Sequence, residues 1–293
     1  MRFALIACRD TPTNGALARA APSGLGWETL DPHEALAALR PGDVALGRLD
    51  VLPTLDGIDD GLWALGALDA RGVTVLNEPA ALLAAHDKLL TARLLRRNGI
   101  AHPWTWHSRP ARSIPRLLGP VVVKPRYGSW GREVHRCEDA ESLRRTLERV
   151  QNAPWYCRHG ALVQELVPPQ GYDLRVLVAA GRVVGAVHRV AARGEWRTNV
   201  ALGGARRPVA EPPHEVGVVA VEAARAVGAS LVGVDLLPDG FGGWVVAELN
   251  GAVEFTHEYA AWHDVFAETA AALVCEAFDR QGRDLAPMPS GLA

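Results

Sequence analysis

Two acidic side chains lie inside a predicted β-hairpin in the C-terminal third of the chain. The apolar runs 231–237 and 244–249 flank residues 238–243, a glycine-rich turn that also holds a proline and an aspartate. This pattern is typical of a β-hairpin. Antiparallel pairing about the turn brings Asp235 opposite Glu248.

Asn250 adds a third oxygen-bearing side chain, because residues two apart on one strand share a face and Asn250 therefore lies beside Glu248. Oxygen ligands of this kind suit a hard cation. Mg²⁺ takes one or two carboxylates, keeps waters and shares its remaining positions with substrate phosphates. The structural alternative is that Asp235 ends a strand, Glu248 is an edge charge and Asn250 opens a loop.

Lysine is scarce in this chain. Of the 31 basic residues only Lys88 and Lys124 are lysines, which leaves 29 arginines. A chain that uses arginine almost everywhere keeps lysine where a compact, flexible point charge is needed. Phosphate oxygens in a tight pocket are such a place.

Lys124 belongs to a β-branched strand, residues 120–125, which a glycine-containing loop follows. Residues 126–133 read RYGSWGRE, with two glycines and a serine among charged residues. We expect a mobile loop whose backbone N–H groups cover phosphates and which closes over them to exclude water. The candidate contacts are Gly128, Ser129, Trp130 and Gly131. A simple hairpin turn is the alternative.

Two further segments suit a nucleotide. The strand 162–167 ends at a pair of prolines, which indicates a connection between two lobes. Backbone groups of such a segment typically hold an adenine, although a plain linker fits equally well. The loop 191–204 carries Arg197 and Asn199 ahead of paired glycines, a combination that suits oxyanion binding. A solvated loop is the alternative there.

The elements that position these groups begin with a small parallel α/β unit over about the first 80 residues. Strands at 3–7, 43–47 and 73–76 alternate with helical stretches, one of them at 61–70. The other expected elements are helices at 80–98, 140–150, 213–228 and 265–280, and a second hairpin formed by 173–179 and 182–189. We expect the helix at 213–228 to pack beneath the hairpin that carries the acids.

The composition describes an ordinary globular protein. A hydrophobic content of 48% and a net charge of −2 over 293 residues give no sign of a nucleic-acid surface. The apolar runs are too short to span a membrane, and Arg9-Asp10 comes too early for a signal peptide. The four cysteines lie far apart without a CxxC pair, which argues against a zinc site or disulfide framework and favours a reducing cytoplasm.

Together these features resemble the ATP-grasp superfamily, from roughly Phe3 to Arg280. The stretches QELVPPQGYDLRVLV, GEWRTNVALGG and GVDLL…VVAELN look like those of the RimK-type amino-acid ligases. KPRYGSWGR at 124–132 and NGAVEF at 250–255 are similar to the LysX and ArgX ligases, which load amino acids onto a small acidic amino-group carrier protein. Each motif alone is weak, but their order and spacing are specific.

The resemblance implies an α/β (α+β) protein with the ATP-grasp fold. A small parallel α/β lobe is followed by two lobes that sandwich ATP between antiparallel sheets. The expected divisions are an N-terminal lobe at 1–80, a central lobe at 81–164, a C-terminal lobe at 165–284 and a flexible tail at 285–293. Such ligases are usually dimers or tetramers, so we expect a homodimer or homotetramer in the cytoplasm.

The resemblance also implies roles for individual residues. The residues expected at the phosphates are Lys88, Lys124 and the loop Gly128, Ser129, Trp130 and Gly131. Those expected at the adenine and ribose are Glu165, Leu166 and Asp173. Arg197 and Asn199 face the phosphates or the acyl intermediate. The expected ligands of Mg²⁺, with Mn²⁺ as an alternative, are Asp235, Glu248 and Asn250. The residues expected at the amino acid are Arg132, Arg193, Asn250, Glu254 and Phe255, with Glu254 at the amine and the arginines at a carboxylate.

The implied chemistry is carboxylate activation. A substrate carboxylate attacks the γ-phosphate of ATP to give an acyl phosphate and ADP, and an amine then attacks the acyl carbon and expels phosphate. In LysX-like ligases the carboxylate is the C-terminal glutamate side chain of the carrier, and the amine belongs to α-aminoadipate or glutamate. Gly251 and Ala252 stand where those ligases carry a histidine and threonines, so the amino acid stays open.

Three other functions fit the same residues. A RimK-like ligase that adds glutamate to a protein tail or peptide, and a dipeptide ligase that joins free amino acids, share the mechanism and differ in the acceptor. A degenerate ATP-grasp domain that binds nucleotide without turnover is the non-enzymatic alternative. The complete set of lysines and metal-ligand candidates argues against that alternative.

Overall fold

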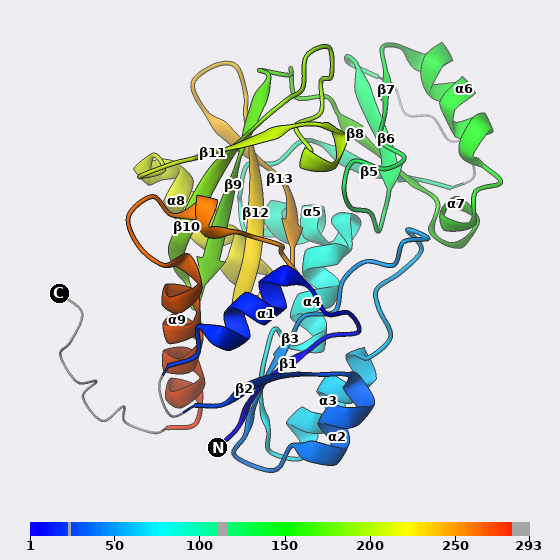
Figure 1. Ribbon diagram of the computed structural model, residues 1–293. Helices are drawn as coiled ribbons and strands as arrows, with labels where there is room; N and C mark the ends of the chain where they lie inside the picture. The colour runs from blue at the N-terminus through cyan, green and yellow to red at the C-terminus, as the bar shows by residue number, and fades with distance from the viewer. Residues whose placement is uncertain (23–24, 110–116, 283–293) are drawn as a thin grey trace.

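Three β-sheets organise the chain (Figure 1). The computed structural model describes residues 1–22, 25–109 and 117–282. The tail predicted at 285–293 lies outside the described residues. Within them, no helix is both long and apolar enough to cross a membrane.

The first sheet is parallel, with the strand order β2-β1-β3-β4. It consists of β1 (Phe3–Ile6), β2 (Trp27–Leu30), β3 (Val44–Gly47) and β4 (Thr74–Leu76), connected by α1 (Pro12–Arg19), α2 (Pro32–Ala38) and α3 (Leu62–Ala70). The expected parallel unit is confirmed. The sequence pattern missed β2, because only Trp27 of its four residues is buried and the segment has no apolar run.

Both faces of the first sheet are buried. Ala4 and Ile6 of β1 pack in the core that α2 and α3 cover. Phe3 and Leu5 point the other way, into a core that includes Phe266 and Leu273 of α9 (Val265–Arg280). Figure 1 shows α9 beside α1 at this face. That core continues into the third sheet, so the N-terminal lobe and the C-terminal lobe share one interior.

The second sheet is antiparallel, with the order β5-β8-β6-β7, and projects to one side of the molecule (Figure 1). It consists of β5 (Thr105–Ser108), β6 (Val121–Pro125), β7 (His135–Cys137) and β8 (Ala161–Glu165), with α6 (Ala140–Val150) and α7 (Pro154–His159) on one face. Val121 and Val123 pack in the core under these helices. Alternation therefore turns Lys124 to the opposite face.

The third sheet is antiparallel, with the order β11-β10-β9-β12-β13. It consists of β9 (Tyr172–Ala179), β10 (Arg182–Val190), β11 (Ala205–Pro208), β12 (Leu231–Pro238) and β13 (Trp244–Asn250). Both predicted hairpins are confirmed, and Asp235 pairs with Glu248. The helix α8 (His214–Val227) packs on β12 and β13, as expected. A register shift after Asp235 lets Val246 and Leu249 both reach the core under α8.

The single helix predicted at 80–98 is wrong, because the chain breaks at Asp87. The break separates α4 (Pro79–His86) from α5 (Lys88–Arg97), both of which pack against the third sheet. Asp87 has an extended ψ of 95°, and its carboxylate caps α5 by accepting hydrogen bonds from the backbone of Leu89 and Leu90 at 3.1 and 3.3 Å. Lys88 therefore begins a helix instead of lying in the middle of one.

Asn77, just after β4, joins the first sheet to the third. Its side chain is buried and donates to the carbonyl oxygens of Gly47, Leu231 and Gly251 at 3.3, 2.8 and 3.1 Å. Its Oδ1 accepts from the backbone N–H groups of Ser230 and Leu231 at 2.9 and 3.0 Å. The residue holds a left-handed φ of 51°. One carboxamide thus satisfies five backbone groups of three segments.

Candidate active site

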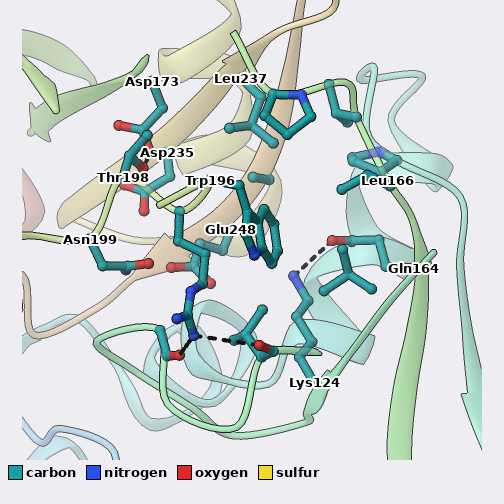
Figure 2. Close-up of a pocket in the computed structure, with 18 of the residues that line it drawn as sticks. Lys124, Gln164, Leu166, Asp173, Trp196, Thr198, Asn199, Asp235, Leu237 and Glu248 are labelled. Carbon is teal, nitrogen blue, oxygen red and sulfur yellow. Dashed lines mark hydrogen bonds between the residues drawn. The ribbon is translucent and has the colours of Figure 1, made fainter. Parts of the chain in front are cut away.

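A cleft of about 1020 Å³ lies between the inner faces of the second and third sheets. Figure 2 shows Lys124, Gln164 and Leu166 on one side of this cleft and Asp173, Asp235 and Asn199 on the other. Helices pack on the outer faces of both sheets, so each side of the cleft is a sheet supported by helices.

Lys124 is buried in the wall of the cleft. Its ammonium donates to Oε1 of Gln164 at 2.8 Å (Figure 2). Burial lowers the pKa of Lys124 to about 8, and the nearby carboxylate of Glu248 offsets only part of that effect. An anion bound beside Lys124 stabilises its protonated form.

Lys88 reaches the same cleft from the start of α5. Its ammonium donates to the carbonyl oxygen of Gly128 at 2.5 Å and lies 3.3 Å from the Glu248 carboxylate. Lys88 and Lys124 come from different elements, and both line the cleft. The only two lysines of the chain thus line one cleft, where the Glu248 carboxylate is paired with Lys88 and acts on Lys124 through its charge.

The loop 126–133 docks on both sides of the cleft. The guanidinium of Arg126 binds the Asp87 carboxylate, with 2.6 Å between Nε and Oδ1. At the other end Gly131 has a left-handed φ of 70°, and a Cβ there would lie 2.6 Å from Oδ1 of Asn199. Glycine adopts this φ without strain and leaves room for the Asn199 side chain. The cleft is lined by the predicted loop residues Gly128, Ser129 and Gly131 and by Arg132.

Arg197 ties the loop 126–133 to the loop that precedes β11. Its guanidinium binds the carboxylate of Glu195 at 2.8 Å and the carbonyl oxygen of Gly131 at 3.0 Å. The hydrogen bond from Arg197 lowers the pKa of Glu195 to about 2. Arg197 and Asn199 both line the cleft, as expected. Arg193 of the same loop is exposed and lines neither the cleft nor the pocket beside it.

A buried network of two acids and two arginines forms the floor beside Glu248. Arg175 binds both oxygens of Asp235 at 2.5 and 2.7 Å, and Arg189 bridges Asp235 at 2.7 Å to Asp173. Burial alone would raise the pKa of Asp235, but the two guanidinium groups lower it below its ordinary value. Thr198 also donates to Asp173.

Sequence reasoning did not identify the two arginines of this network. A usable signal exists in β9, where Asp173 and Arg175 stand two residues apart in an otherwise apolar strand. Charged residues at this spacing on one face of a buried strand require partners on the neighbouring strands. Arg175 lies opposite Asp235, and Asp173 lies opposite Arg189.

Glu248 and Asn250 fit a magnesium ion. Both side chains line the pocket beside the cleft, and each offers an oxygen to a cation. Both oxygens of Asp235, in contrast, are occupied by guanidinium groups. One carboxylate, one carboxamide, waters and substrate phosphates meet the usual demands of Mg²⁺. Among the described residues, no three His, Cys, Asp or Glu side chains gather in a way that could hold a metal.

A second pocket of about 670 Å³ opens from the cleft. The two cavities share the residues Ser129, Arg189, Asn199 and Glu248. Of the residues expected at the amino acid, Glu254 lines this pocket, whereas Phe255 is buried and stacks on Phe266 with 4.7 Å between ring centroids. Trp130 lines it too, with the guanidinium of Arg132 4.9 Å from its ring centroid. Glu165 and Leu166 lie in the cleft, with Asp173 on the facing wall.

Comparison with known proteins now identifies the family. Residues 85–268 match the family model of the RimK-like ATP-grasp domain, which is more than half of the chain. The chain belongs to the RimK-like ATP-grasp family. This confirms the family predicted from the motifs. Ligases of the ATP-grasp type use ATP and Mg²⁺.

Two curated relatives of this RimK-like protein are named as ligases. It is 32% identical over 184 residues to the α-aminoadipate–LysW ligase LysX of Sulfurisphaera tokodaii, an alignment covering 61% of this chain and 64% of that protein. It is 31% identical over 223 residues to the tetrahydromethanopterin:α-L-glutamate ligase of Methanosarcina acetivorans, covering 70% of this chain and 68% of that protein. The chain therefore spans slightly less than two thirds of LysX.

Solved structures confirm the ATP-grasp fold. The structure of the ATP-grasp ligase PsnB complexed with minimal precursor, Mg and ADP matches with a TM-score of 0.68 at 20% identity, covering 94% of this chain and 98% of that one. At this identity the likeness establishes the fold alone. The parallel sheet followed by two antiparallel sheets is the arrangement predicted from the sequence.

Proposed function

We propose that this RimK-like protein is an ATP-dependent carboxylate–amine ligase that forms ADP and joins an amino acid to a carboxylate through an acyl phosphate. The observation that carries this proposal is that Lys88 and Lys124 both line one cleft between two sheets, with the Glu248 carboxylate beside Lys88. Two buried ammonium groups need an anionic ligand of high charge, and a nucleotide triphosphate is one.

The residues of the cleft have different proposed roles, which follow from their positions. Lys88 and Lys124 bind phosphate oxygens and stabilise the charge of the transferring group, which is usually the largest part of such catalysis. Glu165 and Leu166 hold the adenine on the segment that leaves β8, and Asp173 lies nearest the ribose. Glu248 and Asn250 hold Mg²⁺, which when bound neutralises phosphate charge. Asp235 orients Arg175 and Arg189.

The second pocket takes the amino acid, because it opens on the cleft at Glu248 and Asn199, where an acyl phosphate would form. For the acceptor we propose a small acidic carrier protein or peptide with a C-terminal glutamate. LysX, named for ligating α-aminoadipate to LysW, supports this choice. The second candidate is addition of glutamate to another acceptor, which the name of the Methanosarcina relative favours.

Intact-mass spectrometry tests the proposal. A glutamate-terminated peptide is incubated with the protein, Mg²⁺-ATP and a pool of amino acids that includes α-aminoadipate and glutamate, with an ATP-free sample as control. We expect the peptide to gain the mass of one amino-acid residue, which identifies the amino acid. ADP release from the amino acids alone, without a mass gain, indicates a ligase of free amino acids. No ADP under any condition contradicts the proposal.

The affinity for ADP should fall as the pH rises above about 8. Burial sets the pKa of Lys124 near that value in the free protein, whereas bound phosphates favour the ammonium form. Binding above pH 8 therefore requires uptake of a proton, and the Kd should rise by up to about tenfold per pH unit. Calorimetric titrations with ADP between pH 7 and 9.5 measure this Kd. The Lys124→Met variant should bind more weakly at pH 7 and lack this dependence; an unchanged slope would refute the role of Lys124.

A further inference from the structure

Two carboxylates line the second pocket in addition to Glu248, one from the N-terminal lobe and one from the C-terminal lobe. Asp50 comes from the segment after β3, and Glu254 comes from the segment after β13. The two carboxylates differ in their partners. Arg48, itself buried, donates to Oε1 of Glu254 at 3.2 Å, and Thr11 donates to the same oxygen at 3.0 Å. The charge of Glu254 is therefore already balanced.

Asp50 has no such cation. Its Oδ1 accepts from the backbone N–H of Val51 at 2.7 Å, and no basic side chain of the described residues lies within 4 Å of its carboxylate. Arg9, the nearest candidate in sequence, is bound to Asp59 at 2.9 Å instead. Burial raises the pKa of Asp50, and the more distant Arg9 and Arg48 offset only part of this effect.

The other charges that line the second pocket are already paired. Arg175 and Arg189 are held by acids of the buried network, and Glu248 lies 3.3 Å from Lys88. The loosest of these pairs is that of Arg206 with Glu258, which are 3.6 Å apart, and Arg206 is partly exposed. Among the described residues that line this pocket, Asp50 is thus the only carboxylate without a cation partner.

Two further atoms indicate that this pocket is built for a polar ligand. Oγ of Ser129 and Nδ2 of Asn250 are buried without hydrogen-bond partners, and both residues line the pocket. Buried polar groups are rarely left unpaired in folded proteins. Ser129 also lines the cleft, whereas Asp50 comes from the N-terminal lobe.

We propose that Asp50 is a specificity-determining residue that binds an ammonium group of the amino-acid substrate. The inference rests on the proposed function. It assigns recognition of the substrate amine to Asp50, whereas the sequence motif assigned it to Glu254. A free carboxylate and the loosely held Arg206 line the same pocket and match the two charges of an amino acid. The ammonium is either the α-ammonium or that of a basic side chain.

Calorimetric binding to the full chain, with Mg²⁺ and a non-hydrolysable ATP analogue present, tests the inference. The probes are two matched pairs, glutamate with glutarate and lysine with norleucine, so that one member of each pair lacks one ammonium group. In Asp50→Asn we expect at least a tenfold loss of affinity for the ammonium-bearing probe that the wild-type protein binds. The affinity for the nucleotide analogue and for glutarate should not change. Asp69→Asn, an exposed acid on α3, is the control and should behave as wild type.

The outcomes separate the inference from the function. If Asp50→Asn loses affinity for both glutamate and lysine, Asp50 binds the α-ammonium. If it loses affinity for lysine alone, Asp50 binds the side-chain ammonium. Equal affinities in wild type and Asp50→Asn overturn the inference and leave the ligase proposal standing. Wild-type protein that binds the nucleotide analogue but no amino acid overturns both the inference and the amino-acid part of the proposed function.

Discussion

Replacing Glu248 with alanine should lower the rate of ADP formation by about a thousandfold. The carboxylate is paired with Lys88, and among the described residues it is the only acidic side chain that lines both cavities. Its loss removes the carboxylate ligand proposed for Mg²⁺ and leaves the Lys88 ammonium without its counter-charge. Removing one group that stabilises the transferring charge typically costs about 10²–10³ in rate. A coupled assay of ADP with the amino-acid pool measures the effect.

A matched variant separates this effect from a general loss of structure. Glu222 is an exposed acid on α8, so Glu222→Ala should retain wild-type turnover. The Glu248→Ala protein should remain folded without urea, because the Glu248 side chain is not part of a hydrophobic core, but the loss of the counter-charge of Lys88 should lower its urea midpoint. Turnover of Glu248→Ala within a few fold of wild type would mean that the cleft is not the catalytic site.

Replacing Asn77 with alanine should lower the free energy of unfolding by roughly 3–5 kcal/mol, because each buried backbone group left without a partner costs about 1–3 kcal/mol. Five backbone groups lose their partner at once. Alanine must also adopt the left-handed φ of 51°, which asparagine tolerates better. Stabilities of whole proteins are only about 5–15 kcal/mol, so this loss is large. Urea unfolding followed by circular dichroism measures it.

Two variants define what the Asn77 result means. Asn77→Asp keeps the acceptor oxygen and removes the amide donors, so it should lose stability while retaining the hydrogen bonds from Ser230 and Leu231. Asn152→Ala, at an exposed turn, should unfold at the wild-type midpoint. An Asn77→Ala midpoint equal to that of wild type would show that the carboxamide does not hold the sheets together.

The sequence was most informative where neighbours along the chain decide the structure. The pairing of Asp235 with Glu248 follows from one turn and two apolar runs, and the structure has it in that register. The scarcity of lysine pointed to Lys88 and Lys124 without any knowledge of contacts. The break at Asp87 was missed because apolar spacing continues through it, although an aspartate can begin a helix as well as sit inside one.

Contacts between distant segments could not be predicted in the same way. Asp50 and Glu254 are 204 positions apart, and nothing in the local pattern of either shows that Arg48 neutralises one acid and not the other. The same holds for Arg175 and Arg189, whose partners lie on other strands. Phe255 was expected at the substrate because of its motif, but alternation along its segment turns it into the core with Phe266.

The core shared by the first sheet and α9 sets an order of events during synthesis. Phe3 and Leu5 leave the ribosome roughly 260 residues before Phe266 and Leu273 become available to cover them. At about 5–20 residues per second this interval is roughly 13–50 s. During that time only α1 and neighbouring N-terminal residues can cover this apolar face of the N-terminal sheet, so the nascent chain should be a client of ribosome-associated chaperones until α9 emerges.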